Sequence, residues 1–71
     1  MRPNFDLEPG AVYEGSFGQV REVIEFDPEE TTLRYRMIHL GTQPRSHVPR
    51  EGETDKIQVH VFVDWIKREV A

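Results

Sequence analysis

The feature that most constrains the fold of this chain is a pair of β-rich segments, residues 19–26 and 32–39, joined by a short turn. Both segments are rich in the β-branched, aromatic and aliphatic residues that favour strands. The intervening DPEE begins with Asp27, whose carboxylate can accept hydrogen bonds from nearby amides, and Pro28, which presets φ. The pattern predicts an antiparallel hairpin.

Side chains alternate between the two faces of a strand, so each segment divides into two sets. In the second strand, the expected sets are Leu33, Tyr35 and Met37 on one face, and Arg34, Arg36 and Ile38 on the other. In the first strand, they are Val20, Ile24 and Phe26 on one face, and Arg21, Val23 and Glu25 on the other.

The residues before the hairpin predict a lead-in over 1–9 and a single domain over 10–71. A short strand is expected at Val12 and Tyr13. Gly15 and Gly18 then bracket a loop or bulge, where a missing Cβ permits positive φ.

The residues after the hairpin predict a long loop over 41–55, which contains two prolines and two glycines. Loops of this length in small domains tend to be functional or mobile. A strand over 56–60 is expected to pass into a helix over 61–70, because strand-like and helix-like spacings overlap there. Asp64 at the N-cap of a shorter helix is the alternative.

The length of 71 residues fits one small domain with a limited core. Aromatic side chains would supply much of that core, and most are expected to be buried: Phe17, Phe26, Tyr35, Phe62 and Trp65. Trp65 has a second reading as an exposed anchor for a partner.

The stretch from Glu14 to Arg36 resembles the KOW/SH3-like motif, in which glycines precede a strand, an acidic turn and a second strand. The matching residues are Gly15, Gly18, Val20, Ile24, Asp27, Leu33 and Tyr35. The resemblance implies a mainly β fold, a small SH3-like barrel with a short C-terminal α-helix. KOW domains bind RNA, ribosomal partners or RNA polymerase partners, but the net charge of −4 departs from basic ribosomal examples.

The ending FVDW, Phe62 to Trp65, also makes the chain similar to short bacterial and phage proteins of uncharacterised role. That resemblance implies an accessory protein or a host-directed inhibitor and assigns no chemistry.

Charge is unevenly distributed along the chain. Residues 1–30 carry eight acids and two arginines, residues 31–50 carry four arginines and no acid, and residues 51–71 carry five acids and three bases. The acid-free segment yields the candidate binding residues Arg34, Arg36, Arg45, His47 and Arg50. They would pair with phosphates or with carboxylates of a partner protein. Alternatively, Arg34 and Arg36 pair within the hairpin with acids such as Glu25, or with Glu29 and Glu30 at the turn.

Other chemistries find little support in the sequence. There is no cysteine, and the spacing of His39, His47 and His60 matches no zinc motif. Ser16 and Ser46 lie in no nucleophile motif. We therefore expect no enzyme, cofactor or small-molecule substrate. No apolar run reaches the roughly 20 residues of a membrane span, and a cytoplasmic location is expected.

The function expected from these observations is a non-enzymatic binding module that acts by protein–protein contact. The alternative is a nucleic-acid-binding module that uses Arg34, Arg36, Arg45 and Arg50.

Overall fold

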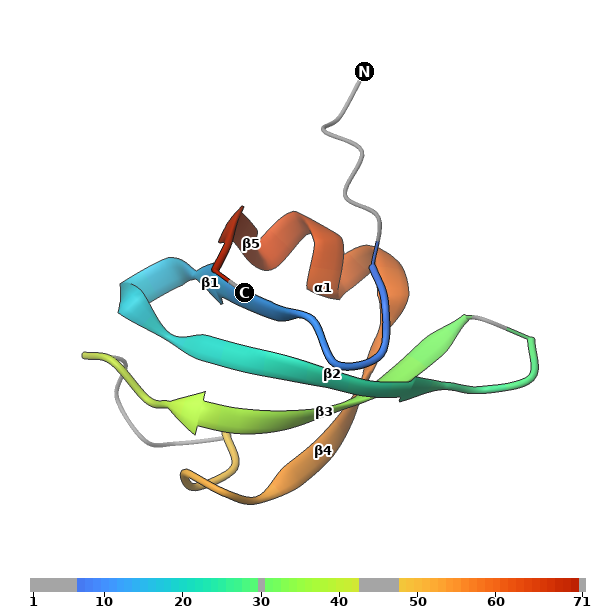
Figure 1. Ribbon diagram of the computed structural model, residues 1–71, viewed down its shortest axis with the longest axis horizontal. Coiled ribbons are helices and arrows are strands. Elements are labelled where there is room, and N and C mark those ends of the chain that lie inside the picture. Colours follow the sequence, from blue (N-terminus) through green and yellow to red (C-terminus); the bar gives the residue numbers. More distant parts are fainter. Residues whose placement is uncertain (1–6, 30, 43–47, 71) are drawn as a thin grey trace.

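The computed structural model describes residues 7–29, 31–42 and 48–70. Within them the elements, in chain order, are β1 (Val12–Gly15), the 3₁₀ turn η1 (Ser16–Gly18), β2 (Val20–Phe26), β3 (Thr32–His39), β4 (Thr54–Gln58), α1 (Val59–Trp65) and β5 (Ile66–Glu69). The five strands form one antiparallel sheet in the order β4-β3-β2-β1-β5 (Figure 1). The predicted mainly β class is confirmed.

The predicted hairpin is confirmed as β2 and β3, which pair antiparallel. Its turn is held by Asp27. One carboxylate oxygen of Asp27 accepts the N–H of Thr31 at 2.9 Å, and the other accepts the hydroxyl of Thr32 at 2.9 Å. The backbone N–H of Asp27 in turn donates to the carbonyl of Thr32 at 3.0 Å. The acceptor role expected of Asp27 is therefore present.

A bulge in β2 makes the predicted face assignments of Glu25 and Phe26 wrong. Val23 pairs with Tyr35, but Glu25 pairs with Arg34, so β2 advances two residues where β3 advances one. The extra residue reverses the alternation from that point on. Glu25 consequently lies on the outer face of the sheet with Arg34 and not on the inner face with Val23. Phe26, the partner of Leu33, packs against the core on the inner face and does not share a face with Ile24.

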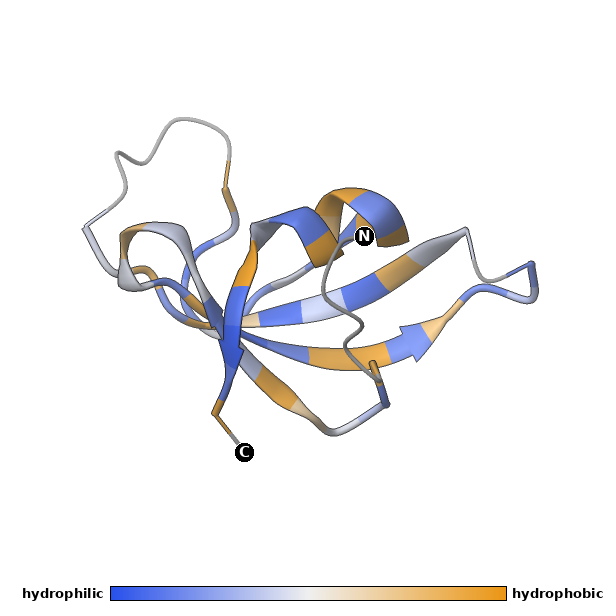
Figure 2. Ribbon diagram, turned by 90° about the horizontal axis from the view of Figure 1, so that it is seen from above, coloured by the Kyte–Doolittle hydropathy of each residue, from blue (hydrophilic) through white to orange (hydrophobic). Residues whose placement is uncertain are grey.

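The inner face of the sheet carries the core. Its buried residues come from β1, β2, β3, α1 and the start of β5: Tyr13, Val23, Leu33, Tyr35, Met37, Phe62 and Ile66. The face predicted for Leu33, Tyr35 and Met37 is confirmed, and Figure 2 shows the alternation as bands of hydrophobic and hydrophilic colour along the strands.

The predicted bounds at the C-terminal end are wrong. Strand β4 starts at Thr54, inside the predicted loop over 41–55, and α1 occupies Val59–Trp65. Strand β5 (Ile66–Glu69) follows the helix and pairs with β1 through Glu14 and Arg68. Arg68 Nε donates to Glu14 Oε1 at 2.6 Å. This pairing gives backbone partners to the edge of β1, which a longer helix would leave unpaired. Asp64 lies in the helix and does not cap it.

Phe62 joins α1 to the sheet. Its ring centroid lies 6.0 Å from that of Tyr13, edge to face, and 6.0 Å from that of Tyr35. Trp65 packs against Phe62 at 5.2 Å and covers Gly15, where an added Cβ would lie 2.2 Å from the indole. Phe17 is the exception among the predicted core aromatics, because 56% of its surface is exposed.

Replacing Phe62 by alanine should lower the free energy of unfolding by about 3–5 kcal/mol, because it removes a ring that contacts three others. Urea unfolding measures this. Val61→Ala is the matched control, since Val61 precedes Phe62 but is 42% exposed. Equal losses in the two variants would contradict the central role of Phe62.

If Phe62→Ala proves unfolded, urea unfolding of Phe62→Leu can be measured in its place. It keeps the site apolar but removes the aromatic contacts, and a midpoint between those of the wild type and Phe62→Ala is expected.

Candidate functional site

The outer face of β2, β3 and β4 is a charged surface ordered by strand register. The cross-strand partners form two rows, Glu22–Arg36–Thr54 and Glu25–Arg34–Lys56. Acids therefore stand on β2 and cations on β3 and β4. The predicted arginine pair Arg34 and Arg36 lies at the centre of this surface, on the face expected for it.

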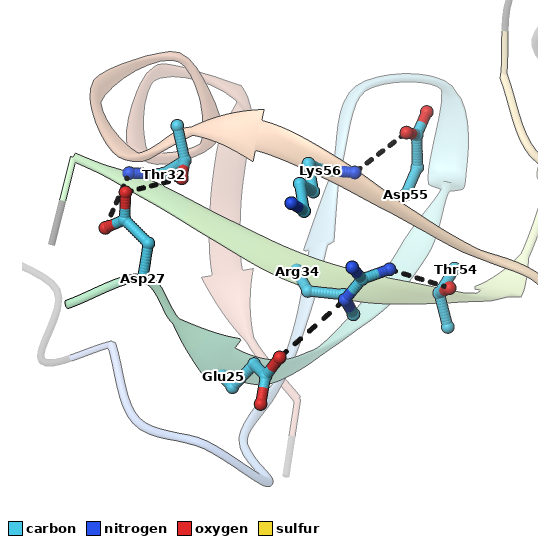
Figure 3. A network of polar contacts seen from close by, with 7 residues as sticks. All are labelled: Glu25, Asp27, Thr32, Arg34, Thr54, Asp55 and Lys56. Atoms are coloured by element: carbon cyan, nitrogen blue, oxygen red, sulfur yellow. Dashed lines mark hydrogen bonds and ion pairs between the residues drawn. The ribbon is translucent and has the colours of Figure 1, made fainter.

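Each of these two arginines has a carboxylate of β2 beside it. Arg36 Nη1 lies 3.4 Å from Glu22 Oε1, and Arg34 Nε lies 3.8 Å from Glu25 Oε2. Arg34 Nη1 also donates to Thr54 Oγ1 at 3.4 Å (Figure 3). The predicted pairing of Arg34 with Glu25 is thus present. Exposed pairs of this kind contribute about 0–1 kcal/mol and can exchange for a ligand at little cost.

A cleft of about 200 Å³ lies on this face beside the hairpin turn, lined by Glu25, Asp27, Pro28, Thr32, Leu33, Arg34 and Lys56. In Figure 3 the side chain of Lys56 extends towards Arg34, whereas Asp55 points to the opposite side of β4. One carboxylate oxygen of Asp55 accepts the backbone N–H of Lys56 at 2.8 Å. Lys56 is a candidate that the sequence did not reveal, because its position opposite Arg34 depends on the pairing of β4 with β3.

A second cleft, of about 300 Å³, is lined by Leu40, Val48, Pro49 and Arg50. Its lining residue Leu40 directly follows β3, and the turn after Leu40 contacts η1 through the hydrogen bond from Thr42 to Phe17. Two acids that follow Arg50 in the sequence accept hydrogen bonds from backbone amides. Glu51 accepts the N–H of Leu40, and Glu53 accepts the N–H of Arg50.

Phe17 stands at the same end. Its backbone has a φ of 63°, and its carbonyl accepts the N–H of Thr42 at 2.9 Å. Gly41, which precedes Thr42, has a φ of 66° and approaches Phe17 so closely that an added Cβ would lie 2.1 Å from that carbonyl oxygen. The turn after β3 thus holds Phe17 in a left-handed conformation that costs a bulky residue about 1–3 kcal/mol.

The predicted site residues are therefore only partly brought together. Arg34 and Arg36 share the outer face, whereas Arg50 lines the cleft at the η1 end. Arg45 and His47 lie outside the described residues.

Arg21 is a buried cation. Strand alternation predicted that it shares a face with Val23, but not that aromatic rings surround it. Only 6% of its surface is exposed, and its guanidinium carbon lies 4.6 Å from the ring centroid of Tyr35 and 4.1 Å from that of Trp65. Nε donates to Gln19 Oε1 at 2.9 Å. Burial lowers the pKa of Arg21, and the Coulomb interactions with Tyr35 and Asp55 partly oppose this. Two aromatic faces hold the cation and leave it little access to a ligand.

The described residues contain no group of three or more side chains suited to hold a metal ion. His39 uses Nδ1 to accept the N–H of Gly41 at 3.0 Å, and His60 is exposed near the start of α1. In the same part of the chain, no helix has the length and apolar character needed to cross a membrane.

Comparison of the chain with protein-family models, with curated proteins and with solved structures gave no match. The geometry of the two clefts and the outer face is therefore the basis for assigning a function.

The stability of the turn beside the first cleft should depend on pH through Asp27. Desolvation acts to raise its pKa, but the hydrogen bonds from Thr32 and Thr31 outweigh it and hold the pKa below the ordinary value of 3.8. Because the pKa of Asp27 is lower in the folded protein than in the unfolded chain, its ionised carboxylate stabilises the folded state fully above pH 3.8. This contribution is lost as the pH falls through the lower pKa of the folded state.

Urea unfolding of the wild type and of Asp27→Asn between pH 5 and about pH 2 tests this. The free energy of unfolding should fall more steeply with acidification in the wild type, because the variant has no carboxylate to protonate at this position. Parallel pH profiles would show that Asp27 does not contribute.

Proposed function

We propose that this chain is a non-enzymatic binding module that acts by protein–protein contact through its η1 end, defined by Phe17, Leu40, Val48 and Pro49. The observation that carries the proposal is Phe17, a large aromatic side chain that is 56% exposed on a left-handed backbone. Its exposed ring adds little to the core, and its conformation costs stability.

The neighbourhood of Phe17 supports this proposal. Isolated exposed apolar residues are common on protein surfaces and need no explanation. The carbonyl of Phe17, however, accepts a hydrogen bond from Thr42 in the turn that follows Leu40. Leu40 lines the cleft together with Val48, Pro49 and Arg50. An exposed aromatic ring near a cleft that an arginine lines agrees with the enrichment of aromatic residues and arginine in protein interfaces.

We further propose that the sheet belongs to an SH3-like barrel. Two features support this: the strand order β4-β3-β2-β1-β5 and the short helix α1 between the last two strands. Such a fold would serve as a rigid support for loops at its ends, although a fold by itself does not define a partner.

Nucleic-acid binding is the competing proposal, and the charges of the outer face favour it less. Arg34 and Arg36 each stand beside a glutamate of β2, so a phosphate backbone would meet carboxylates as well as cations. Binding of that kind would weaken steeply with salt, at a log–log slope of about −0.9 per phosphate contacted on duplex DNA.

Replacing Phe17 by asparagine should separate stability from binding. Asparagine tolerates a left-handed backbone better than phenylalanine, so the melting temperature should be unchanged or higher, while the exposed ring is lost. Partners captured by immobilised wild-type protein from a lysate should be lost with Phe17→Asn bait. Val70→Asn is the matched control and should retain them. Val70 is 46% exposed, and its backbone N–H donates to Val12, at the end of β1 away from η1.

Amide NMR spectra during addition of short duplex DNA and then RNA, at low and at physiological salt, test the competing proposal. Protein contact predicts no shifts at physiological salt. Shifts centred on Arg34 and Arg36 that fade with salt would instead assign the chain to nucleic acid.

A further inference from the structure

We propose that Arg34 and Lys56 together bind one carboxylate group of a partner protein at the cleft beside the hairpin turn. This site lies on the outer face of the sheet and is separate from the η1 end. It does not depend on the contact proposed for Phe17.

The register of β3 and β4 carries the inference. Arg34 and Lys56 are direct cross-strand partners, and both line the cleft of about 200 Å³ (Figure 3). Directly opposed side chains on neighbouring strands have Cβ atoms about 4.5–5.5 Å apart, and like charges in that position destabilise a sheet. The fold therefore holds two cations together at a cost to its own stability.

Among the described residues, the ammonium group of Lys56 forms no ion pair. Glu25 lies 3.8 Å from Arg34 Nε, at the long limit of an ion pair. Asp27 lines the same cleft as a carboxylate, but its two oxygens already accept hydrogen bonds from Thr31 and Thr32. A carboxylate bound between Arg34 and Lys56 would give Lys56 an ion-pair partner.

The same acids define the class of ligand. Glu25 and Asp27 line the cleft, and Glu29 is exposed on the turn beside it. A phosphate dianion or a nucleic-acid backbone would bring several negative charges close to these carboxylates. A single aspartate or glutamate side chain of a protein brings one, and it can form charge-assisted hydrogen bonds with both cations. The volume of about 200 Å³ accommodates such a side chain, since one water occupies about 30 Å³ in the liquid.

The charge-reversing variant Lys56→Glu tests the inference through two readouts with opposite expected signs. It turns the repulsive pair with Arg34 into an attractive one, so the melting temperature should rise by about 2–4 °C at low salt. It should at the same time remove carboxylate binding. Lys67→Glu is the matched control, because Lys67 is an exposed lysine on β5, at the other end of the strand order.

Binding is measured by amide NMR with a capped octapeptide that holds one glutamate among seven serines, at constant ionic strength. The wild type and Lys67→Glu should show shifts at Arg34, Lys56 and their strand neighbours. Lys56→Glu should bind the peptide at least about tenfold more weakly, which corresponds to 1.4 kcal/mol. An all-serine peptide should produce no shifts.

Three results would overturn the inference. The first is a melting temperature of Lys56→Glu that is equal to or below that of the wild type. The second is equal peptide shifts in Lys56→Glu and Lys67→Glu. The third is a larger response of these amides to inorganic phosphate or to duplex RNA than to the peptide, which would assign the site to phosphate groups. The peptide titration does not involve Phe17. Failure of the carboxylate inference would therefore not contradict the binding function proposed for the η1 end, which the capture experiment tests separately.

Discussion

The packing of Phe62 between Tyr13 and Tyr35 is the interaction on which the rest of the structure depends. It joins α1 to β1 and β3, which lie on either side of β2 in the sheet. A helix of seven residues is too short to be stable in water without such packing. Once α1 is fixed, the chain leaves it at Ile66 beside Gly15, and β5 can pair with β1. The position of the last strand therefore follows from one buried ring.

The inner face of the sheet also holds a charge, and this shapes how charge is used elsewhere. Arg21 lies between the rings of Tyr35 and Trp65, with Gln19 as a hydrogen-bond partner. Its Nη1 and the Nε1 of Trp65 are buried without a hydrogen-bond partner in the described part of the chain. An arginine enclosed in this way contributes to packing and not to binding. Arg34 and Arg36 on the outer face and Arg50 at the η1 end are, in contrast, open to a partner.

The two proposed surfaces share one property: each contains residues whose arrangement lowers the stability of the fold. At the η1 end, Phe17 is held in a left-handed conformation with its ring exposed. On the outer face, Arg34 and Lys56 are held opposite each other as like charges. Residues that are unfavourable for folding and favourable for contact are typical of functional sites, where stability and activity compete. One surface is apolar and the other is polar, so a partner could engage both.

The sequence by itself determined the local features: the hairpin of β2 and β3, the turn held by Asp27, and the inward set Leu33, Tyr35 and Met37. These depend on neighbouring residues, which propensity and alternation describe well. Only the tertiary structure decided the bulge that turned Glu25 outward, the strand formed by Ile66–Glu69, the exposure of Phe17 and the meeting of Lys56 with Arg34. Each of these depends on which distant segments pair, and pairing between strands is set by burial and register across the whole sheet, which no local pattern contains.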